Sequence, residues 1–258
     1  MRTQDQRTQD QLVSEQFGSV AEAYFTSPVH AHGRDLQELA MHVRQRPDSS
    51  ILDLGCGAGH ASFAVAPHAK KVTAYDLSEP MLAVVTRAAR ERGLHNIEVR
   101  QGGTEALPFA DASFDIVCTR YSAHHWSQLE QALAEIHRVL KPGGQCLVID
   151  IVAPAATVAD TYLQTIEVLR DASHIRDYTL AEWSGRLQKA GLCEVGRQSW
   201  KLQLDFESWV QRMRTPAERV RAIRSLWDVA PQEVVSWFRL EKDYSFTVDA
   251  ALIEAVKS

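Results

Sequence analysis

The chain has 258 residues, with 28 Lys and Arg against 33 Asp and Glu, and a net charge of −5. Because no basic block is present, this balance excludes a typical nucleic-acid or membrane-surface binder and favours a small-molecule partner. An apolar fraction of 45% supplies the core of one α/β domain with an elaboration. The sequence contains no signal-like or membrane-spanning run, which predicts a cytoplasmic protein.

The N-terminal part is predicted to lie outside the sheet. Residues 1–11 contain the duplicated pentad R-T-Q-D-Q and are predicted to form a polar, flexible tail before a single domain at 12–258. Residues 12–48 carry apolar residues at helical spacing, which predicts a helical cap. The four cysteines lie apart without a C-x-x-C pair and are predicted to be buried free thiols.

The sequence I-L-D-L-G-C-G-A-G-H at 51–60 is the strongest functional motif. An apolar strand is followed by three alternate glycines, which predicts a turn whose backbone can approach a nucleotide-like ligand. The third glycine arrives one residue too early for the dinucleotide fingerprint, and His60 takes the last position. Asp53 would repel a pyrophosphate but suits an ammonium or sulfonium group. A plain structural turn is the alternative.

A second strand at 71–75 ends in Asp76, about 20 residues after the glycines, where an acid can accept both hydroxyls of a ribose. The alternative for Asp76 is an N-cap of the next helix, but Ser78 is better placed for that task. Further strands at 96–100, 114–119 and 145–152 predict a doubly wound parallel sheet over a core at 49–152. Residues that follow the first, second and fourth strands should therefore meet in one crevice.

Four motifs carry a resemblance to a known family. They are I-L-D-L-G-C-G-A-G at 51–59, V-T-A-Y-D-L-S at 72–78, G-G-T-E-A-L-P-F-A-D-A-S-F-D-I-V at 102–117 and H-R-V-L-K-P-G-G at 137–144. With this order and spacing, the chain resembles the class I S-adenosylmethionine-dependent methyltransferases, and among them the small quinone-biosynthesis C-methyltransferases. The resemblance implies a seven-stranded, mainly parallel Rossmann-like sheet, completed by an antiparallel last strand near the C-terminus. It also implies S-adenosylmethionine as cofactor and methyl transfer to a small molecule.

Carried over to this chain, the resemblance places Asp53, Gly55 and Gly57 at the methionine moiety and Asp76 at the ribose. Relatives commonly have Asp where this chain has Gly103, so the contact with the adenine amino group is in doubt, and Gly103→Asp is expected to gain affinity. Phe17 is expected to face the cofactor from the cap. The full set of implied cofactor contacts is Tyr24, Asp53, Gly55, Cys56, Gly57, Asp76, Leu77, Met81, Gly103, Thr104, Glu105 and Arg120.

The loop T-R-Y-S-A-H-H-W at 119–126 is the chemically richest stretch. His124 or His125 is a candidate general base, and the alternative is that one packs beneath the cofactor while the other bonds a loop carbonyl. Zinc would need further ligands at supporting spacing, so no metal site is predicted. Three roles are open for Arg120: it anchors an anionic acceptor, it binds the cofactor carboxylate, or it only forms a salt bridge.

Two helical inserts, at 153–180 and 205–243, are predicted to form a lid over the acceptor opening. The Trp-rich second insert favours a core or homodimer face over a substrate clamp. The candidate acceptor-binding residues, from the loop and the first insert, are Tyr121, Trp126, Tyr162, His174, Arg176 and Tyr178.

Two other functions remain as alternatives. A nicotinamide-dependent oxidoreductase would use the glycine loop for a pyrophosphate, which Asp53 and His60 disfavour. A non-catalytic sensor of S-adenosylmethionine or S-adenosylhomocysteine would keep the cofactor site and lack turnover.

Overall fold

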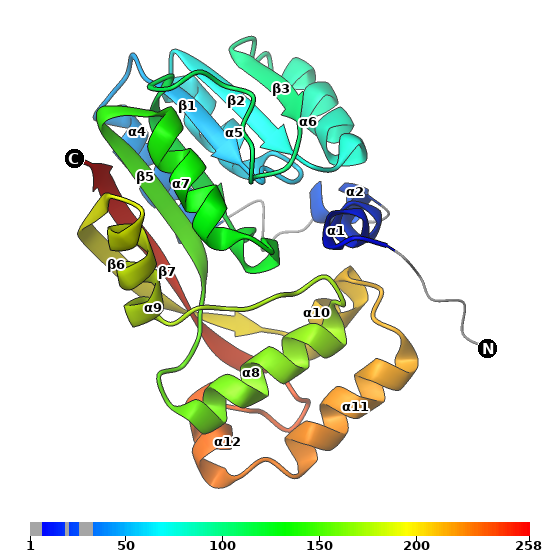
Figure 1. Cartoon of the computed structure of the whole chain (residues 1–258). Coiled ribbons are helices and arrows are strands. Elements are labelled where there is room, and N and C mark those ends of the chain that lie inside the picture. The colour runs from blue at the N-terminus through cyan, green and yellow to red at the C-terminus, as the bar shows by residue number, and fades with distance from the viewer. Residues whose placement is uncertain (1–6, 19–20, 26–32) are drawn as a thin grey trace.

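A computed structural model describes residues 7–18, 21–25 and 33–258 and shows one seven-stranded sheet (Figure 1). The strand order is β3-β2-β1-β4-β5-β7-β6; β1 to β5 run parallel, and β7 pairs antiparallel with both β5 and β6. The predicted doubly wound, mainly parallel sheet is confirmed. The strands are β1 (Ser50–Leu54), β2 (Lys71–Asp76), β3 (Ile97–Gln101), β4 (Phe114–Arg120), β5 (Leu140–Val152), β6 (Leu192–Leu204) and β7 (Phe246–Lys257).

Helices cover both faces of the sheet because side chains along its strands alternate between two cores. On β1, Ile51 packs with one hydrophobic cluster, while Leu52 and Leu54 pack with another. The first core lies under α4 (Arg34–Arg44) and α5 (His60–Val65), next to α6 (Glu79–Glu91); the second lies under α7 (Leu129–Val139) and α9 (Leu180–Lys189).

A separate helical layer packs against the ends of β5, β6 and β7, below the rest of the sheet in Figure 1. Trp209, Trp227 and Phe246 are among its buried aromatic residues, so the Trp-rich insert forms a core, as predicted. Trp237 is the exception, at 38% exposed. The layer consists of α8 (Thr157–Arg170), α10 (Phe206–Arg212), α11 (Ala217–Asp228) and α12 (Gln232–Phe238).

The first helix begins earlier than the sequence analysis expected. Helix α1 (Gln9–Gly18) starts within the segment assigned to the polar tail, and α2 (Ala21–Phe25) follows. The reason is a capping box: the Thr8 Oγ1 accepts the Gln11 N–H at 3.2 Å, and the Gln11 Oε1 accepts the Thr8 N–H at 2.9 Å. In Figure 1, α1 lies between the sheet and the helices α8 and α10.

Two further expectations can be compared with the structure. Cys56, Cys118 and Cys146 are buried free thiols, but Cys193 is exposed because it lies on the edge strand β6. Within the described ranges, no helix combines the length and apolarity needed to cross a membrane.

Candidate functional site

The turn after β1 brings backbone against a cavity because its glycines adopt left-handed dihedrals. Gly55 and Gly57 have φ values of 69° and 51°. A Cβ on Gly55 would lie 2.0 Å from the Ser122 Oγ, so a larger residue does not fit there. A Cβ on Gly57 would meet no atom within 4 Å, because Gly57 faces the open cavity. The turn therefore leaves room for a ligand directly beside its backbone.

Asp76, at the end of β2, fixes this turn. Its Oδ2 accepts the Gly57 N–H at 2.8 Å, and its Oδ1 accepts the Ser78 N–H at 2.8 Å. Burial raises the pKa of this carboxyl above its ordinary value, and the backbone hydrogen bonds oppose the rise. Ser78 occupies the N-cap position of α6 but makes no side-chain capping hydrogen bond. Each Asp76 oxygen can still accept a second hydrogen bond, from a ligand hydroxyl.

Asp53 supplies a second carboxylate at the cavity wall. It is 1% exposed, and its Oδ2 accepts the Ser62 hydroxyl at 2.6 Å. Burial raises the pKa of Asp53 to about 6, although the hydrogen bond from Ser62 opposes the rise. A cationic ligand beside Asp53 would stabilise its ionised form.

Arg120 forms a buried salt bridge with Asp35 of α4, and its guanidinium lies 4.8 Å from the Tyr121 ring centroid. Its Nη2 is buried without a hydrogen-bond partner, and the residue lines the cavity. Among the alternatives for Arg120, the salt bridge is present. The two N–H groups of Nη2 can donate to an anionic group.

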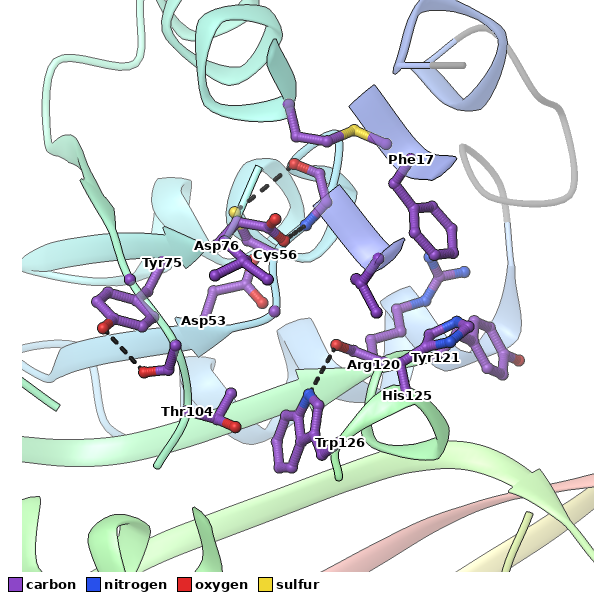
Figure 2. Close-up of a pocket in the computed structure, with 18 of the residues that line it drawn as sticks. Phe17, Asp53, Cys56, Tyr75, Asp76, Thr104, Arg120, Tyr121, His125 and Trp126 are labelled. Carbon is purple, nitrogen blue, oxygen red and sulfur yellow. Dashed lines mark hydrogen bonds between the residues drawn. The ribbon is translucent and has the colours of Figure 1, made fainter. Parts of the chain in front are cut away.

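These groups surround a first cavity (Figure 2). Every implied cofactor contact lines it except Tyr24, whose side chain lies outside the described residues. In the close-up, Phe17 and His125 stand at one side of the cavity, and Tyr75 and Thr104 at the other. The sequence analysis missed several lining residues, namely Asp10, Val13, Ala58, His60, Ala61, Tyr75, Gly102 and Ser122.

Helix α1 covers the first cavity and ties it to the helical layer. Asp10, Val13 and Phe17 line the cavity from this helix. The Gln9 Nε2 donates to the Ser173 carbonyl oxygen at 2.6 Å, and the Gln16 Nε2 donates to the Met213 carbonyl oxygen at 3.2 Å. The cap is therefore anchored to both helical inserts, at Ser173 of the first and Met213 of the second.

The two adjacent histidines occupy different electrostatic environments. His125 Nδ1 lies 3.1 Å from the Ser173 carbonyl oxygen; burial and then the charge of His124 lower its pKa to about 4. His124 Nδ1 lies 2.6 Å from Asp150 Oδ1. Burial opposes the charged form of His124, but the nearby Asp150 and Asp177 outweigh it and raise its pKa to about 9. His125 is therefore the neutral imidazole of the pair.

A second cavity adjoins the first. Phe17, Tyr121 and His125 line both cavities, so the two spaces meet at these side chains. The other lining residues of the second cavity are His124, Ile151, Glu167, Arg170, Asp171, Asp177, Leu202, Leu204, Trp209 and Arg212.

Five of the six candidate acceptor-binding residues lie outside the second cavity. Trp126 lines the first cavity instead. Tyr162 stacks on Trp227 at 6.0 Å within the helical layer, so its ring packs the core. The remaining residues also have structural partners: His174 bonds Gln164, Arg176 pairs with Asp160, and Tyr178 packs on Trp183. Of the six residues, Tyr121 alone lines the second cavity, and the acceptor roles of the other five stay predictions.

Comparisons of the sequence and of the structure with known proteins point to the same family. The family model for a methyltransferase domain matches residues 52–148. The chain is 47% identical over 204 residues to the uncharacterized protein YafE of Escherichia coli, covering 79% of this chain and 99% of that protein. It is 35% identical over 246 residues to the uncharacterized methyltransferase YcgJ of Bacillus subtilis, covering 93% of this chain and 97% of YcgJ.

The crystal structure of YcgJ superposes with a TM-score of 0.84, covering 88% of this chain and 99% of that one. A demethylmenaquinone methyltransferase of Chlorobaculum parvum is 43% identical over 114 residues, covering 43% of this chain and 45% of that protein. Identities of 47% and 35% to YafE and YcgJ extend over most of this chain. Together with the matching fold, they show that this chain belongs to the methyltransferase family.

Proposed function

We propose that this methyltransferase binds S-adenosylmethionine in the first cavity and a small-molecule acceptor in the second. The observation that carries the proposal is the junction of the two cavities at Phe17, Tyr121 and His125. Methyl transfer is an in-line displacement, so donor and acceptor must occupy adjoining spaces with their reacting atoms in contact. Among the described residues, the glycine turn and Asp76 line the first cavity but not the second.

The residues of the first cavity fit this cofactor. Asp76 is placed to accept the ribose hydroxyls, Gly57 offers open space beside the backbone, and the Arg120 Nη2 has its N–H groups available for the carboxylate. Leu77 and Met81 provide apolar contacts for adenine, beside the backbone of Thr104.

The charges of the first cavity favour a cation over a pyrophosphate. Four carboxylates line it in the described part of the chain, from Asp10, Asp53, Asp76 and Glu105. The lining arginine, Arg120, is already paired with Asp35. This balance suits a sulfonium and an ammonium group and disfavours the nicotinamide alternative.

S-adenosylmethionine supplies, when bound, an activated methyl group; the protein must orient the acceptor and take its proton where one is lost. The Ser173 carbonyl oxygen only accepts hydrogen bonds, so His125 carries its proton on Nδ1 and its lone pair on Nε2, which lies 3.9 Å from Asp171 Oδ2 without a hydrogen bond. His125 also stands where the cavities meet. We therefore assign the base to His125 and give His124 a positioning role.

Calorimetric titration with S-adenosylmethionine, S-adenosylhomocysteine and NADH tests the cofactor assignment without a known acceptor. We expect saturable binding of the first two ligands and none of NADH. Binding of NADH alone would overturn the proposal, and binding without turnover across a broad acceptor screen would favour the sensor alternative.

The pH dependence of binding is expected to follow Asp53. Its pKa of about 6 in the free protein means that a cationic ligand must displace a proton at lower pH. Affinity for S-adenosylmethionine should therefore rise by up to about tenfold between about pH 5 and pH 7.5 and then level off. The rise should be shallower in Asp53→Asn and for S-adenosylhomocysteine, which lacks the sulfonium. A flat profile for the unmodified protein would contradict the role of Asp53.

The structure changes the expected effect of Gly103→Asp. A Cβ at this position would lie 3.0 Å from the Glu105 Oε2 and 3.8 Å from the Asp10 Oδ2. A new carboxylate would therefore meet two like charges, at a cost of about 1 kcal/mol each for charges about 4 Å apart in water. We expect Gly103→Asp to bind S-adenosylmethionine more weakly than the isosteric, uncharged Gly103→Asn. Equal or tighter binding by Gly103→Asp in calorimetry would show that the repulsion is absent.

A further inference from the structure

The second cavity contains a cluster that the proposed transfer does not require. His124, Asp150 and Asp177 come from three segments: the short helix after β4, the strand β5 and the loop after α8. His124 Nδ1 lies 2.6 Å from Asp150 Oδ1 and 4.0 Å from Asp177 Oδ1. One ligand-type atom from each residue lies within 4.8 Å of the other two. His124 and Asp177 also line the second cavity.

Two carboxylate oxygens of the cluster lack a partner. Asp150 Oδ2 and Asp177 Oδ2 are buried and make no hydrogen bond. The two residues are 3% and 2% exposed, so bulk water does not satisfy these oxygens. A buried carboxylate oxygen without a donor is costly, and such groups ordinarily have a partner or bind a cation. His124 lies on the other oxygen of Asp150, Oδ1, so this deficit remains and points to a further positive charge beside the two Oδ2 atoms.

Cationic side chains of the cavity already have acidic partners or lie outside the cluster. Arg170 pairs with Glu167 at 3.3 Å and lies over the Trp209 ring. Arg176 follows the cluster in the chain but pairs with Asp160. Arg212 also lines the cavity, at the end of α10, and is not one of the three cluster residues.

We propose that His124, Asp150 and Asp177 bind a divalent metal ion at the wall of the second cavity. One imidazole nitrogen and two carboxylates suit Mn²⁺, Fe²⁺ or Zn²⁺ better than Ca²⁺, which prefers oxygen ligands alone. With bonds of about 2.1 Å, ligand atoms lie about 3.0 Å apart at adjacent octahedral positions and about 4.2 Å apart at opposite ones. The observed 2.6 and 4.0 Å from His124 are within a few tenths of an ångström of these spacings, and the carboxylate oxygens of Asp150 and Asp177 lie within 4.8 Å of each other.

Three protein ligands leave coordination positions open, as in catalytic metal sites. Because His124 and Asp177 line the cavity, the open positions face the space that the proposed function assigns to the acceptor. Sequence spacing could not reveal this site, since His124 and Asp150 are 26 residues apart and meet only through the pairing of β4 with β5. The expectation of no metal site rested on local motifs alone.

Titration of the full-length, EDTA-treated protein with Mn²⁺, followed by calorimetry and by the electron paramagnetic resonance signal of free Mn²⁺, tests the site. We expect one saturable equivalent, and at least a tenfold loss of affinity in Asp177→Asn and in His124→Gln. Asp171→Asn is the matched control: Asp171 lines the same cavity and has a buried Oδ2 that makes no hydrogen bond and lies 3.9 Å from His125 Nε2, but the residue lies outside the cluster. This control should bind Mn²⁺ like the unmodified protein.

Binding of S-adenosylhomocysteine to each variant reports folding and tests the cofactor site separately. Failure of metal binding with intact S-adenosylhomocysteine binding would overturn only the metal proposal. The proposal is also overturned if both cluster variants bind Mn²⁺ and Zn²⁺ like the unmodified protein, or if Asp171→Asn loses as much affinity as Asp177→Asn. Should Asp177→Asn fail to fold, Asp150→Asn and His124→Gln test the site instead, again by whether each loses at least tenfold in Mn²⁺ affinity.

Discussion

Replacing Asp76 with alanine is expected to weaken S-adenosylmethionine binding by about 1.5 to 3 kcal/mol, which is roughly a 10- to 150-fold rise in Kd. The carboxylate is placed to accept the ribose hydroxyls, and hydrogen bonds to a charged acceptor are the strong ones. It also holds the N–H groups of Gly57 and Ser78, so its removal frees the turn on which the ligand lies. Calorimetry with S-adenosylmethionine and S-adenosylhomocysteine measures the loss.

Two controls separate ligand contacts from loop stability. Asp111→Ala removes a carboxylate that is 79% exposed and pairs with Arg138, outside both cavities, so binding should be unchanged. Thermal melting of the ligand-free Asp76→Ala protein reports the structural cost alone. Unchanged affinity in Asp76→Ala would remove this residue from the cofactor site.

Replacing His125 with alanine is expected to lower turnover by about 10²- to 10⁴-fold when the acceptor must lose a proton. The neutral imidazole is held by the Ser173 carbonyl oxygen through Nδ1 and lines both cavities, with Nε2 3.9 Å from Asp171 Oδ2. Transfer of labelled methyl groups to acceptors found in a small-molecule screen measures turnover. Affinity for S-adenosylmethionine should change little, because no ligand charge is paired with this ring.

The matched control is His137→Ala on α7, which removes an imidazole that packs beside Gly191 and lines neither cavity. It should retain the turnover of the unmodified enzyme. Full turnover in His125→Ala, on an acceptor whose reacting group carries a proton at neutral pH, would end the assignment of a base to this residue.

The sheet and the first cavity could be predicted because the residues that form them follow short, local sequence patterns. The glycine turn follows directly on β1, and Asp76 ends β2, so the parallel arrangement brings both to one edge. A strand pattern and a short motif suffice for such a site. Helix α1 was misplaced at its start because the repeated R-T-Q-D-Q pentad suggests disorder, although Thr8 and Gln11 within it form a capping box.

The second cavity, which we propose for the acceptor, could not be predicted in the same way. The residues that line it come from segments far apart in the sequence. Leu202 and Leu204 of β6 meet Trp209 of α10 and Tyr121 only in the folded chain. Aromatic residues of the first insert were better candidates by chemistry, but Tyr162 packs on Trp227, inside the helical layer. Whether an aromatic residue of an amphipathic helix faces a core or a cavity depends on partners that the local pattern does not specify.

A crystal structure with S-adenosylhomocysteine tests most directly the claim that the first cavity holds the cofactor and the second the acceptor. We expect the ribose at Asp76 and the sulfur directed at the junction of Phe17, Tyr121 and His125, with the second cavity left free. A ligand bound elsewhere, or a sulfur that points away from this junction, would contradict the account.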